Sequence, residues 1–325
     1  MRVKQKIIGV TGAAGFIGSH LCEKLLNNGY KVIAVDNLSK GSKNNIRDSL
    51  KNKSFNFFKA DISNPKTARK SFANVDGVVH LAASKIPRYG GRLETLLVNT
   101  EGTKNILEAI KNKKSKFIFA STPDVYGKNP KIPFSEDSDL TVGSPEVARW
   151  AYAASKIFDE HLCFGYWEEY KVPFVILRLF GVYGPRQHRS WWGGPQALFI
   201  DKIIAGKEIE IHGDGHQTRT FIYIDDVVEA LIKSISSEKA NNQIINIGTT
   251  HEISIIELGK LISKLLQKPL KIKKVPYRSF TGKKYEDVRR RTPTIKKAKE
   301  LLNWEPKVSL AEGLKETISW HLKTK

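Results

Sequence analysis

The stretch Gly12-Ala13-Ala14-Gly15-Phe16-Ile17-Gly18 decides the fold. It follows the β-branched run Ile7–Thr11, which predicts a strand, and it opens an amphipathic pattern over Phe16–Asn28, which predicts a helix. Glycines at this spacing let the chain turn tightly and let its backbone approach a pyrophosphate, whose charge then faces the N-terminus of the helix. A strand, a glycine-rich turn and a helix in this order predict a dinucleotide-binding α/β fold.

An acidic residue, Asp36, ends the second predicted strand, which covers Lys31–Val35. A carboxylate at this place accepts hydrogen bonds from the hydroxyl groups of an adenosine ribose and repels a 2′-phosphate. We therefore expect the dinucleotide to be NAD rather than NADP. Asp61-Ile62 follows the third predicted strand, where the carboxylate is placed either to contact the adenine amino group or to cap a helix.

Short β-branched runs alternate with helical patterns through the first half of the chain. Strands are predicted at Ile7–Thr11, Lys31–Val35, Phe55–Ala60, Gly77–Leu81, Lys116–Ser121 and Pro173–Leu179, and helices near Phe16–Asn28, Lys66–Phe72, Thr100–Asn112 and Arg149–Tyr170. This alternation predicts a Rossmann-like, doubly wound parallel sheet, whose ligands bind at the carboxyl ends of the strands. We assign residues 1–180 to an NAD-binding domain and residues 181–325 mainly to a smaller C-terminal α/β lobe for the substrate. The strand predicted at Gln243–Ile247 is a candidate for a return to the main sheet.

Composition limits the partners of the protein. The 325 residues include 54 Lys and Arg against 33 Asp and Glu, a formal net charge of +21. The lysines are scattered without interleaved aromatic residues, so we interpret them as a solvated surface and expect no specific nucleic-acid partner; an anionic substrate fits the charge as well. Two cysteines, Cys22 and Cys163, exclude a disulfide framework or a zinc module, and we expect no metal site. No apolar run approaches the roughly 20 residues of a membrane helix and no signal peptide is recognisable, so we expect a cytoplasmic protein.

Tyr152 and Lys156 lie four residues apart in a predicted helix, which places a phenol and an ammonium group on one face. A neighbouring cation favours the phenolate and so lowers the pKa of a tyrosine toward the range of a general base. Thr122 follows the strand Lys116–Ser121, where its hydroxyl is placed to hydrogen-bond the reacting oxygen. The Tyr-Lys spacing alone is common on helix surfaces, but beside a dinucleotide site it predicts a catalytic base.

The whole chain resembles the extended short-chain dehydrogenase/reductase family, in its group of nucleotide-sugar epimerases, decarboxylases and dehydratases. The motifs that carry the resemblance are Thr11–Gly18, His80-Leu81-Ala82-Ala83, Asn99, Ala120-Ser121-Thr122, Val125-Tyr126-Gly127, Tyr152–Lys156, Arg178, Gly181–Arg186, Gly213-Asp214-Gly215, Arg219, Asp225-Asp226-Val227, Asn246-Ile247-Gly248 and Asn303-Trp304-Glu305-Pro306. The resemblance implies tightly held NAD, a nucleoside-diphosphate sugar as substrate, transient oxidation at C4 of the sugar, and a homodimer in which the helix containing Tyr152 commonly packs. It also implies that Tyr152 is the base, that Lys156 holds the nicotinamide ribose and that Thr122 binds the O4 hydroxyl.

Further residues are expected at the site. Those expected to bind the cofactor are Gly12, Gly15, Phe16, Ile17, Gly18, Asp36, Asn37, Asp61, Ile62, Leu81, Ala82, Ala83 and Lys156. Those expected to bind the substrate are Lys85, Arg186, Arg219, Arg291 and Trp191, because guanidinium groups suit phosphates and an aromatic ring suits a nucleobase. The pair Trp191-Trp192 fits equally well as a packed hinge or a dimer contact, and we interpret His188 as a surface residue.

The residues beside Thr122 bear on the reaction that follows C4 oxidation. The dehydratases that resemble this chain have an acidic pair or Ser-Glu there, whereas this chain has Thr122-Pro123-Asp124. Proline has no proton to give, and aspartate is one methylene shorter than glutamate, so a 4,6-dehydratase is the least favoured alternative. Arg149-Trp150 and Lys284–Pro293 resemble UDP-glucuronate decarboxylases, in which an arginine matching Arg291 serves the active site. The sequence does not distinguish Arg291 from its neighbours Arg289 and Arg290.

Gly181–Gln187 resembles the epimerase branch more closely, and Asp124 in place of the decarboxylase glutamate favours the same branch. We therefore favour an NAD-dependent 4-epimerase that acts on a UDP-sugar, either UDP-glucose and UDP-galactose or a UDP-uronate, with Asp124, Thr122, Tyr152 and Lys156 as its catalytic residues. UDP-glucuronate decarboxylation is the main alternative. A non-enzymatic NAD sensor on the same fold is a further one, disfavoured because Thr122, Tyr152 and Lys156 occur together.

Overall fold

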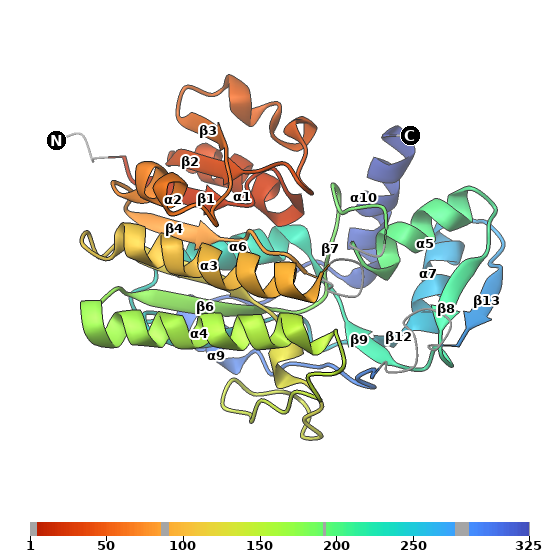
Figure 1. The fold of residues 1–325 in the computed structure, drawn as a ribbon. Helices are drawn as coiled ribbons and strands as arrows, with labels where there is room; N and C mark the ends of the chain where they lie inside the picture. Colours follow the sequence, from red (N-terminus) through yellow and green to blue (C-terminus); the bar gives the residue numbers. More distant parts are fainter. Residues whose placement is uncertain (1–4, 86–90, 191–192, 277–285, 325) are drawn as a thin grey trace.

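A parallel sheet forms the centre of the protein (Figure 1). The computed structural model describes residues 5–85, 91–190, 193–276 and 286–324, and within them the largest sheet has seven strands in the order β11-β6-β5-β4-β1-β2-β3. These strands are β1 (Ile7–Thr11), β2 (Lys31–Asp36), β3 (Phe55–Lys59), β4 (Gly77–His80), β5 (Lys116–Ser121), β6 (Phe174–Leu179) and β11 (Gln243–Ile247). The sheet is the Rossmann-like one that the sequence predicts, and β11 does return to it, as a parallel partner of β6.

Helices cover both faces of the sheet. One face carries α2 (Pro65–Phe72), α3 (Arg92–Ile110) and α4 (Trp150–Tyr170), and the other carries α1 (Phe16–Asn27), α6 (Ile224–Ser236) and α9 (Lys296–Leu302). Side chains of a strand alternate between the two resulting cores. On β5, Phe117 and Phe119 pack among residues of α2, α3 and α4, whereas Ile118 between them packs on the opposite side. Burial on both faces explains why these strands have nearly continuous apolar sequences.

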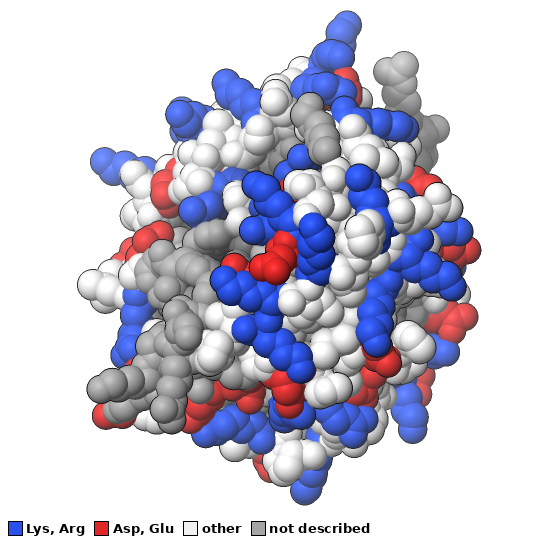
Figure 2. Space-filling model, turned by 90° about the vertical axis from the view of Figure 1, so that its right-hand side faces the viewer, with Lys and Arg blue, Asp and Glu red and all other residues white. Residues whose placement is uncertain are grey.

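A smaller lobe stands beside the carboxyl ends of the strands (Figure 1). It contains α5 (Pro195–Ile204), α7 (Ile255–Leu266), α10 (Leu310–Lys323), the parallel pair β8 (Ile209–His212) and β13 (Ile272–Val275), and the antiparallel pair β9 (Thr218–Thr220) and β12 (Glu252–Ser254). The short pair β7 (Val182–Tyr183) and β10 (Ile222–Tyr223) joins it to the sheet. On the face of this lobe, Lys and Arg are spread widely, interrupted by uncharged residues and a few carboxylates (Figure 2). None of the helices in the described part of the chain has the length and hydrophobicity of a membrane span.

Helix α3 begins at Arg92, eight residues before the predicted start near Thr100. Its polar residues Thr95, Asn99 and Thr103 are buried, while its apolar residues Leu93 and Leu97 are exposed. This inversion removes the apolar periodicity on which a prediction from sequence depends. Five short strands are also absent from the prediction: β7, β9, β10, β12 and β13. Each has only two to four residues, which is too few to show the alternation of apolar and polar residues that marks a strand.

A buried ion pair joins α4 to the centre of the sheet. The Glu160 carboxylate accepts hydrogen bonds from Arg178 Nε (3.0 Å) and Nη2 (2.7 Å), and its Oε1 also accepts one from the Ser121 hydroxyl (2.5 Å). Arg178 stacks over the ring of Tyr126, whose hydroxyl donates to Asn246 of β11 (2.7 Å). Because Glu160 is one turn after Lys156 and Ser121 precedes Thr122, this network supports the strand and the helix that hold the expected catalytic residues.

We expect Glu160→Gln to destabilise the fold by about 3 kcal/mol, because it leaves the buried guanidinium of Arg178 without its counter-charge. The free energy of unfolding in urea measures the effect. Asp48→Asn is the control, since Asp48 forms an exposed ion pair with Lys51 and its loss is expected to leave the free energy of unfolding nearly unchanged. Equal effects of the two substitutions would contradict a structural role for the Glu160–Arg178 pair.

Candidate active site

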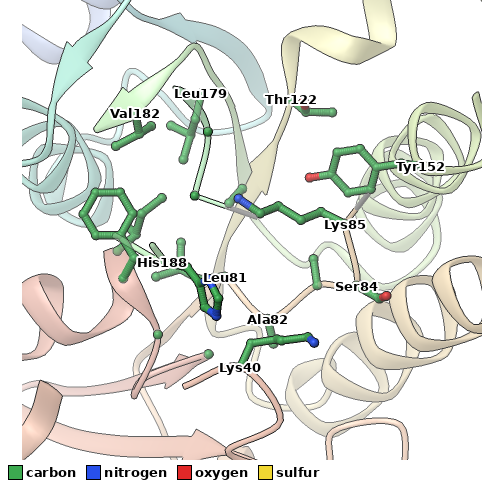
Figure 3. Close-up of a pocket in the computed structure, with 18 of the residues that line it drawn as sticks. Lys40, Leu81, Ala82, Ser84, Lys85, Thr122, Tyr152, Leu179, Val182 and His188 are labelled. Atoms are coloured by element: carbon green, nitrogen blue, oxygen red, sulfur yellow. The ribbon is translucent and has the colours of Figure 1, made fainter. Parts of the chain in front are cut away.

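A cavity lies where the carboxyl ends of the sheet strands meet the smaller lobe (Figure 3). Its volume is about 840 Å³. Every cofactor residue expected from the sequence lines it, from the glycine turn to Lys156, and so do Thr122, Asp124 and Tyr152. One end of the cavity is therefore built by the glycine turn, and the other by β5, α4 and the smaller lobe.

The glycine turn packs too closely against neighbouring backbone to hold side chains at Gly12 and Gly18. Gly12 has a φ of +64°, and a Cβ there would lie 2.9 Å from the amide nitrogen of Ala82. A Cβ on Gly18 would lie 2.1 Å from the carbonyl oxygen of Gly12. No side chain caps α1, whose first residue Phe16 faces the cavity, so the N–H groups at the start of this helix are available to an anion. The turn thus fits the pyrophosphate of a dinucleotide.

Asp36 lies at the far end of this turn with its carboxylate held in place. It accepts hydrogen bonds from the backbone N–H groups of Ala14 (2.9 Å) and Leu38 (2.7 Å). Burial raises the pKa of Asp36, and these two N–H groups oppose the rise. Asp61 accepts a hydrogen bond from the side-chain amide of Asn37 (2.9 Å), which ties together the residues that follow β2 and β3. A carboxylate anchored in this way suits the ribose hydroxyls of NAD.

Tyr152 and Thr122 face each other across the other end of the cavity. The Thr122 hydroxyl is within hydrogen-bonding reach of the phenol, and Figure 3 shows the Tyr152 hydroxyl and the Lys85 ammonium pointing into the same space. Lys156 is buried and donates from Nζ to the carbonyl oxygen of Ala120 (2.9 Å). Desolvation and the nearby charge of Asp124 hold the pKa of Tyr152 above its ordinary range, an effect opposite in sign to the one expected from Lys156.

Asp124 is ionised and bound by two guanidinium groups. Its Oδ1 lies 2.7 Å from Arg291 Nη2 and 3.2 Å from Arg149 Nη2. Burial raises the pKa of Asp124, but Arg291 and Arg149 outweigh burial and lower it to about 2. A group with this pKa is a poor proton donor at neutral pH, so the catalytic role expected for Asp124 becomes one of holding arginines.

A second carboxylate completes what we call the arginine cluster, formed by Arg149, Arg219, Arg291, Asp124 and Asp287. Asp287 Oδ1 lies 2.9 Å from Arg219 Nη2 and 3.3 Å from Arg149 Nη1. Three cations face two anions, which leaves one positive charge within the cluster. All five residues line the cavity, at the end where Tyr152 lies.

The structure separates the three consecutive arginines that the sequence left undistinguished. Arg289 pairs with Asp214 (2.8 Å) and Arg290 with Glu252 (2.7 Å), both on the exposed surface of the smaller lobe. Arg291 alone of the three lines the cavity. Arg291 lies four residues after Asp287, which forms ion pairs with Arg149 and Arg219 and so holds this segment at the cavity.

Of the other residues expected to bind the substrate, some line the cavity and one does not. Lys85 and Arg219 line the cavity. Arg186 does not; it pairs with Glu23 of α1 (2.8 Å). Trp191 lies outside the described residues. His188 is exposed, as we interpreted it, and it also lies at the wall of the cavity, where partial desolvation lowers its pKa.

Sequence reasoning missed several residues of the cavity wall in the smaller lobe. Gln217 and Phe221 lie two residues before and two residues after Arg219 and line the cavity with it. The preceding glycines, Gly213 and Gly215, indicate a turn in the sequence, but they do not indicate which of the following side chains face the cavity. His212 ends β8 at the same wall. The described residues contain no group of His, Cys, Asp and Glu that could hold a metal ion.

Comparison with known proteins agrees with this site. The model of the NAD dependent epimerase/dehydratase family matches residues 8–248. A UDP-N-acetyl-alpha-D-glucosaminuronate decarboxylase of Bacillus cytotoxicus is 39% identical over 313 residues, 96% of each chain, and UDP-glucuronic acid decarboxylase 1 of Xenopus tropicalis is 35% identical over 98% of this chain and 73% of its own length. The crystal structure of UDP-glucuronic acid 4-epimerase from Bacillus cereus, in complex with UDP-glucuronic acid and NAD, is 34% identical, covers 98% of this chain and 100% of its own, and has a TM-score of 0.88. The chain belongs to the NAD dependent epimerase/dehydratase family, a family of nucleotide-sugar enzymes, and NAD is its cofactor.

Proposed function

We propose that the protein oxidises a UDP-linked uronic acid at C4 and releases its carboxyl group as carbon dioxide. The observation that carries this proposal is the position of Arg291, which lies on Asp124 inside the cavity, beside Tyr152 and Thr122. The sequence alone favoured a 4-epimerase because Gly181–Gln187 and Asp124 resemble that branch, and because the sequence did not distinguish Arg291 from its neighbours. The curated decarboxylases that match this chain at 33 to 39% identity support the change.

Each catalytic residue has a task in this reaction. NAD, when bound, takes up the hydride of C4 and later returns it. Tyr152 accepts the proton of the O4 hydroxyl, and Thr122 holds that hydroxyl by a hydrogen bond. Once C4 is a ketone, the sugar is a β-keto acid: the C5–C6 bond breaks, its electron pair enters the C4–C5 bond, and negative charge develops on O4. Tyr152 and Thr122 lie where they can donate to that oxygen, which stabilises the enolate.

The arginine cluster is suited to recognise the carboxylate of the uronic acid. Its three guanidinium groups outnumber its two carboxylates, so the cluster presents a formal excess of positive charge to an anionic group of the substrate. Guanidinium groups bind carboxylates through paired N–H donors, which also fixes the orientation of the sugar. A neutral hexose lacks the group that this cluster would bind.

A specific observation favours 4-epimerisation of the same UDP-uronate as the second candidate. Decarboxylation must end with a proton on C5. Asp124, with its pKa lowered to about 2 by the arginines despite its burial, does not supply this proton, so it has to come from solvent water. Epimerisation needs no such donor, because the hydride returns to the opposite face of C4. The same low pKa argues against a 4,6-dehydratase, which requires an acid for the leaving hydroxyl.

Product analysis tests the proposal. Purified protein with NAD is incubated separately with UDP-glucuronate, UDP-N-acetylglucosaminuronate and UDP-glucose, and the products are separated and weighed by mass spectrometry. We expect a product lighter by one carbon dioxide from at least one of the uronates and no turnover of UDP-glucose. A new product of unchanged mass from a uronate would replace decarboxylation by epimerisation, and turnover of UDP-glucose alone would contradict carboxylate recognition.

We expect Arg291→Met to lower kcat/KM for the uronate by about 100-fold, the loss of one charge-assisted contact to a carboxylate. Arg290→Met is the matched control, because Arg290 is the adjacent residue, carries the same charge and pairs with Glu252 on the surface. Its kcat/KM should stay within about threefold of wild type. Steady-state kinetics on both variants measures the contrast, and similar losses in the two would show that the cluster does not act on the substrate.

Asp36→Ala should weaken the binding of NAD and reduce the preference for NAD over NADP, because the ribose loses its acceptor and a 2′-phosphate is no longer repelled. Isothermal titration of both dinucleotides into both proteins measures the change. If wild-type protein binds NADP as tightly as NAD, the assignment of Asp36 is wrong.

We also propose a cytoplasmic homodimer. Leu93 and Leu97 of α3 and Phe158 of α4 are large apolar side chains exposed on neighbouring helices. Packing these helices against a second copy would bury them. Both cysteines are free and buried, as suits a reducing compartment.

A further inference from the structure

Asp159 is a buried carboxyl group that the reaction described above does not use. It lies in α4, one turn after Lys156, and its exposed fraction is 0%. Neither of its carboxylate oxygens has a hydrogen-bond partner among the described residues. A buried carboxylate without hydrogen bonds is costly, so its presence beside a catalytic lysine calls for a physical role.

The groups that face Asp159 come from two packed helices. On α4 they are Lys156, Glu160 and Cys163, and on α3 the hydroxyl of Thr103, which faces the carboxyl without forming a hydrogen bond. Glu160 is already bound to Arg178. His80 of β4 is also near Lys156, and burial, with the charge of Lys156, lowers its pKa and keeps the imidazole neutral. Lys156 is thus the cation that acts on Asp159.

Burial raises the pKa of Asp159 to about 7, against the opposing effects of Lys156 and Thr103. Burial lowers the pKa of Lys156, and the negative charge of Asp159 opposes that lowering. It also contributes, after desolvation and Asp124, to the raised pKa of Tyr152. The carboxyl is therefore coupled to both residues that handle the proton and the nicotinamide ribose.

We propose that Asp159 is a positioning residue that acts through Lys156 and makes the charge beneath the nicotinamide depend on pH. With the carboxyl ionised, Lys156 and Asp159 together are neutral. With the carboxyl protonated, they carry one positive charge, which repels the cationic ring of NAD and favours the phenolate of Tyr152. One proton on a group that touches neither ligand thus changes both cofactor affinity and the strength of the base.

Asp159→Asn tests the proposal because asparagine has the shape of the protonated carboxyl and does not titrate. For the wild type, we expect the Kd of NAD to rise by about tenfold between about pH 8.5 and pH 5.5, a change equivalent to one pKa unit. For the variant we expect the higher Kd at every pH. The two proteins should coincide at the acidic end, both in NAD binding and in the pH profile of kcat, and diverge above neutral pH. A constant difference at all pH values, or none at any, would overturn the proposal.

Two further variants make the test specific. Glu168→Gln removes an exposed carboxylate from the same helix, and its profiles should match the wild type. Thr103→Val replaces the hydroxyl dipole that faces Asp159 and lowers its pKa with an apolar methyl group, so the wild-type transition should move to higher pH while its amplitude stays the same. If Asp159→Asn does not fold, the shift caused by Thr103→Val still decides the proposal, and an unmoved transition would contradict it.

Unfolding gives a readout that needs neither substrate nor cofactor. Because the pKa of Asp159 in the folded protein is raised above its unfolded value by burial, the folded state binds this proton more tightly between about pH 4 and pH 7, and wild-type stability falls as pH rises through that window. Asp159→Asn should therefore gain stability relative to wild type across this range. The kcat profile rests on the proposed function, whereas NAD titration and unfolding do not, so failure of the substrate assignment is distinguishable from failure of this proposal.

Discussion

The ion pair between Glu160 and Arg178 is the constraint on which the active site depends. It connects α4 to β6, and through Ser121 and Tyr126 it reaches β5 and β11. Tyr152 and Lys156 are on the helix that this pair holds, and Thr122 follows the strand that it holds. A buried charge pair is geometrically demanding, because each partner must keep its hydrogen bonds to offset the loss of water. That demand fixes the distance between the helix that carries Tyr152 and Lys156 and the strand that Thr122 follows.

Charge is arranged around this frame in two layers. At the cavity, the carboxylates of Asp124 and Asp287 occupy three guanidinium groups that would otherwise repel one another. Behind the cavity, the carboxyl of Asp159 faces the ammonium of Lys156. In the first layer Asp124 stays ionised, because Arg291 and Arg149 lower its pKa. In the second the acidic group is desolvated with a single cation nearby, so it can take up a proton near neutral pH.

The sheet, most helices and the cofactor end of the site could be predicted from sequence, because their signals are local. Glycine spacing, alternation of strands and helices, and the Tyr152–Lys156 interval each occupy one short window. The features that could not be predicted depend on distant segments. Arg291 and Arg290 are adjacent arginines, but the side chain of Arg291 lines the cavity whereas that of Arg290 pairs with Glu252 on the surface. Arg186 forms an ion pair with Glu23, which is 163 residues away in the sequence. In the sequence, Asp159 is an ordinary polar residue three positions after Lys156. Its burial depends on the packing of α3 against α4, which the local sequence does not indicate.

The position of β11 has a consequence for how the chain is made. Strands β1 to β6 are complete by Leu179, but the outer edge of β6 stays open until Ile247 has been synthesised, because β11 is its partner. A shorter chain ending after β6 would present an unpaired, apolar strand edge, which is a template for aggregation. About seventy residues, among them Gln217, Arg219 and Phe221 of the cavity wall, must therefore emerge before the sheet closes. The order of synthesis thus ties completion of the sheet to the arrival of part of the smaller lobe.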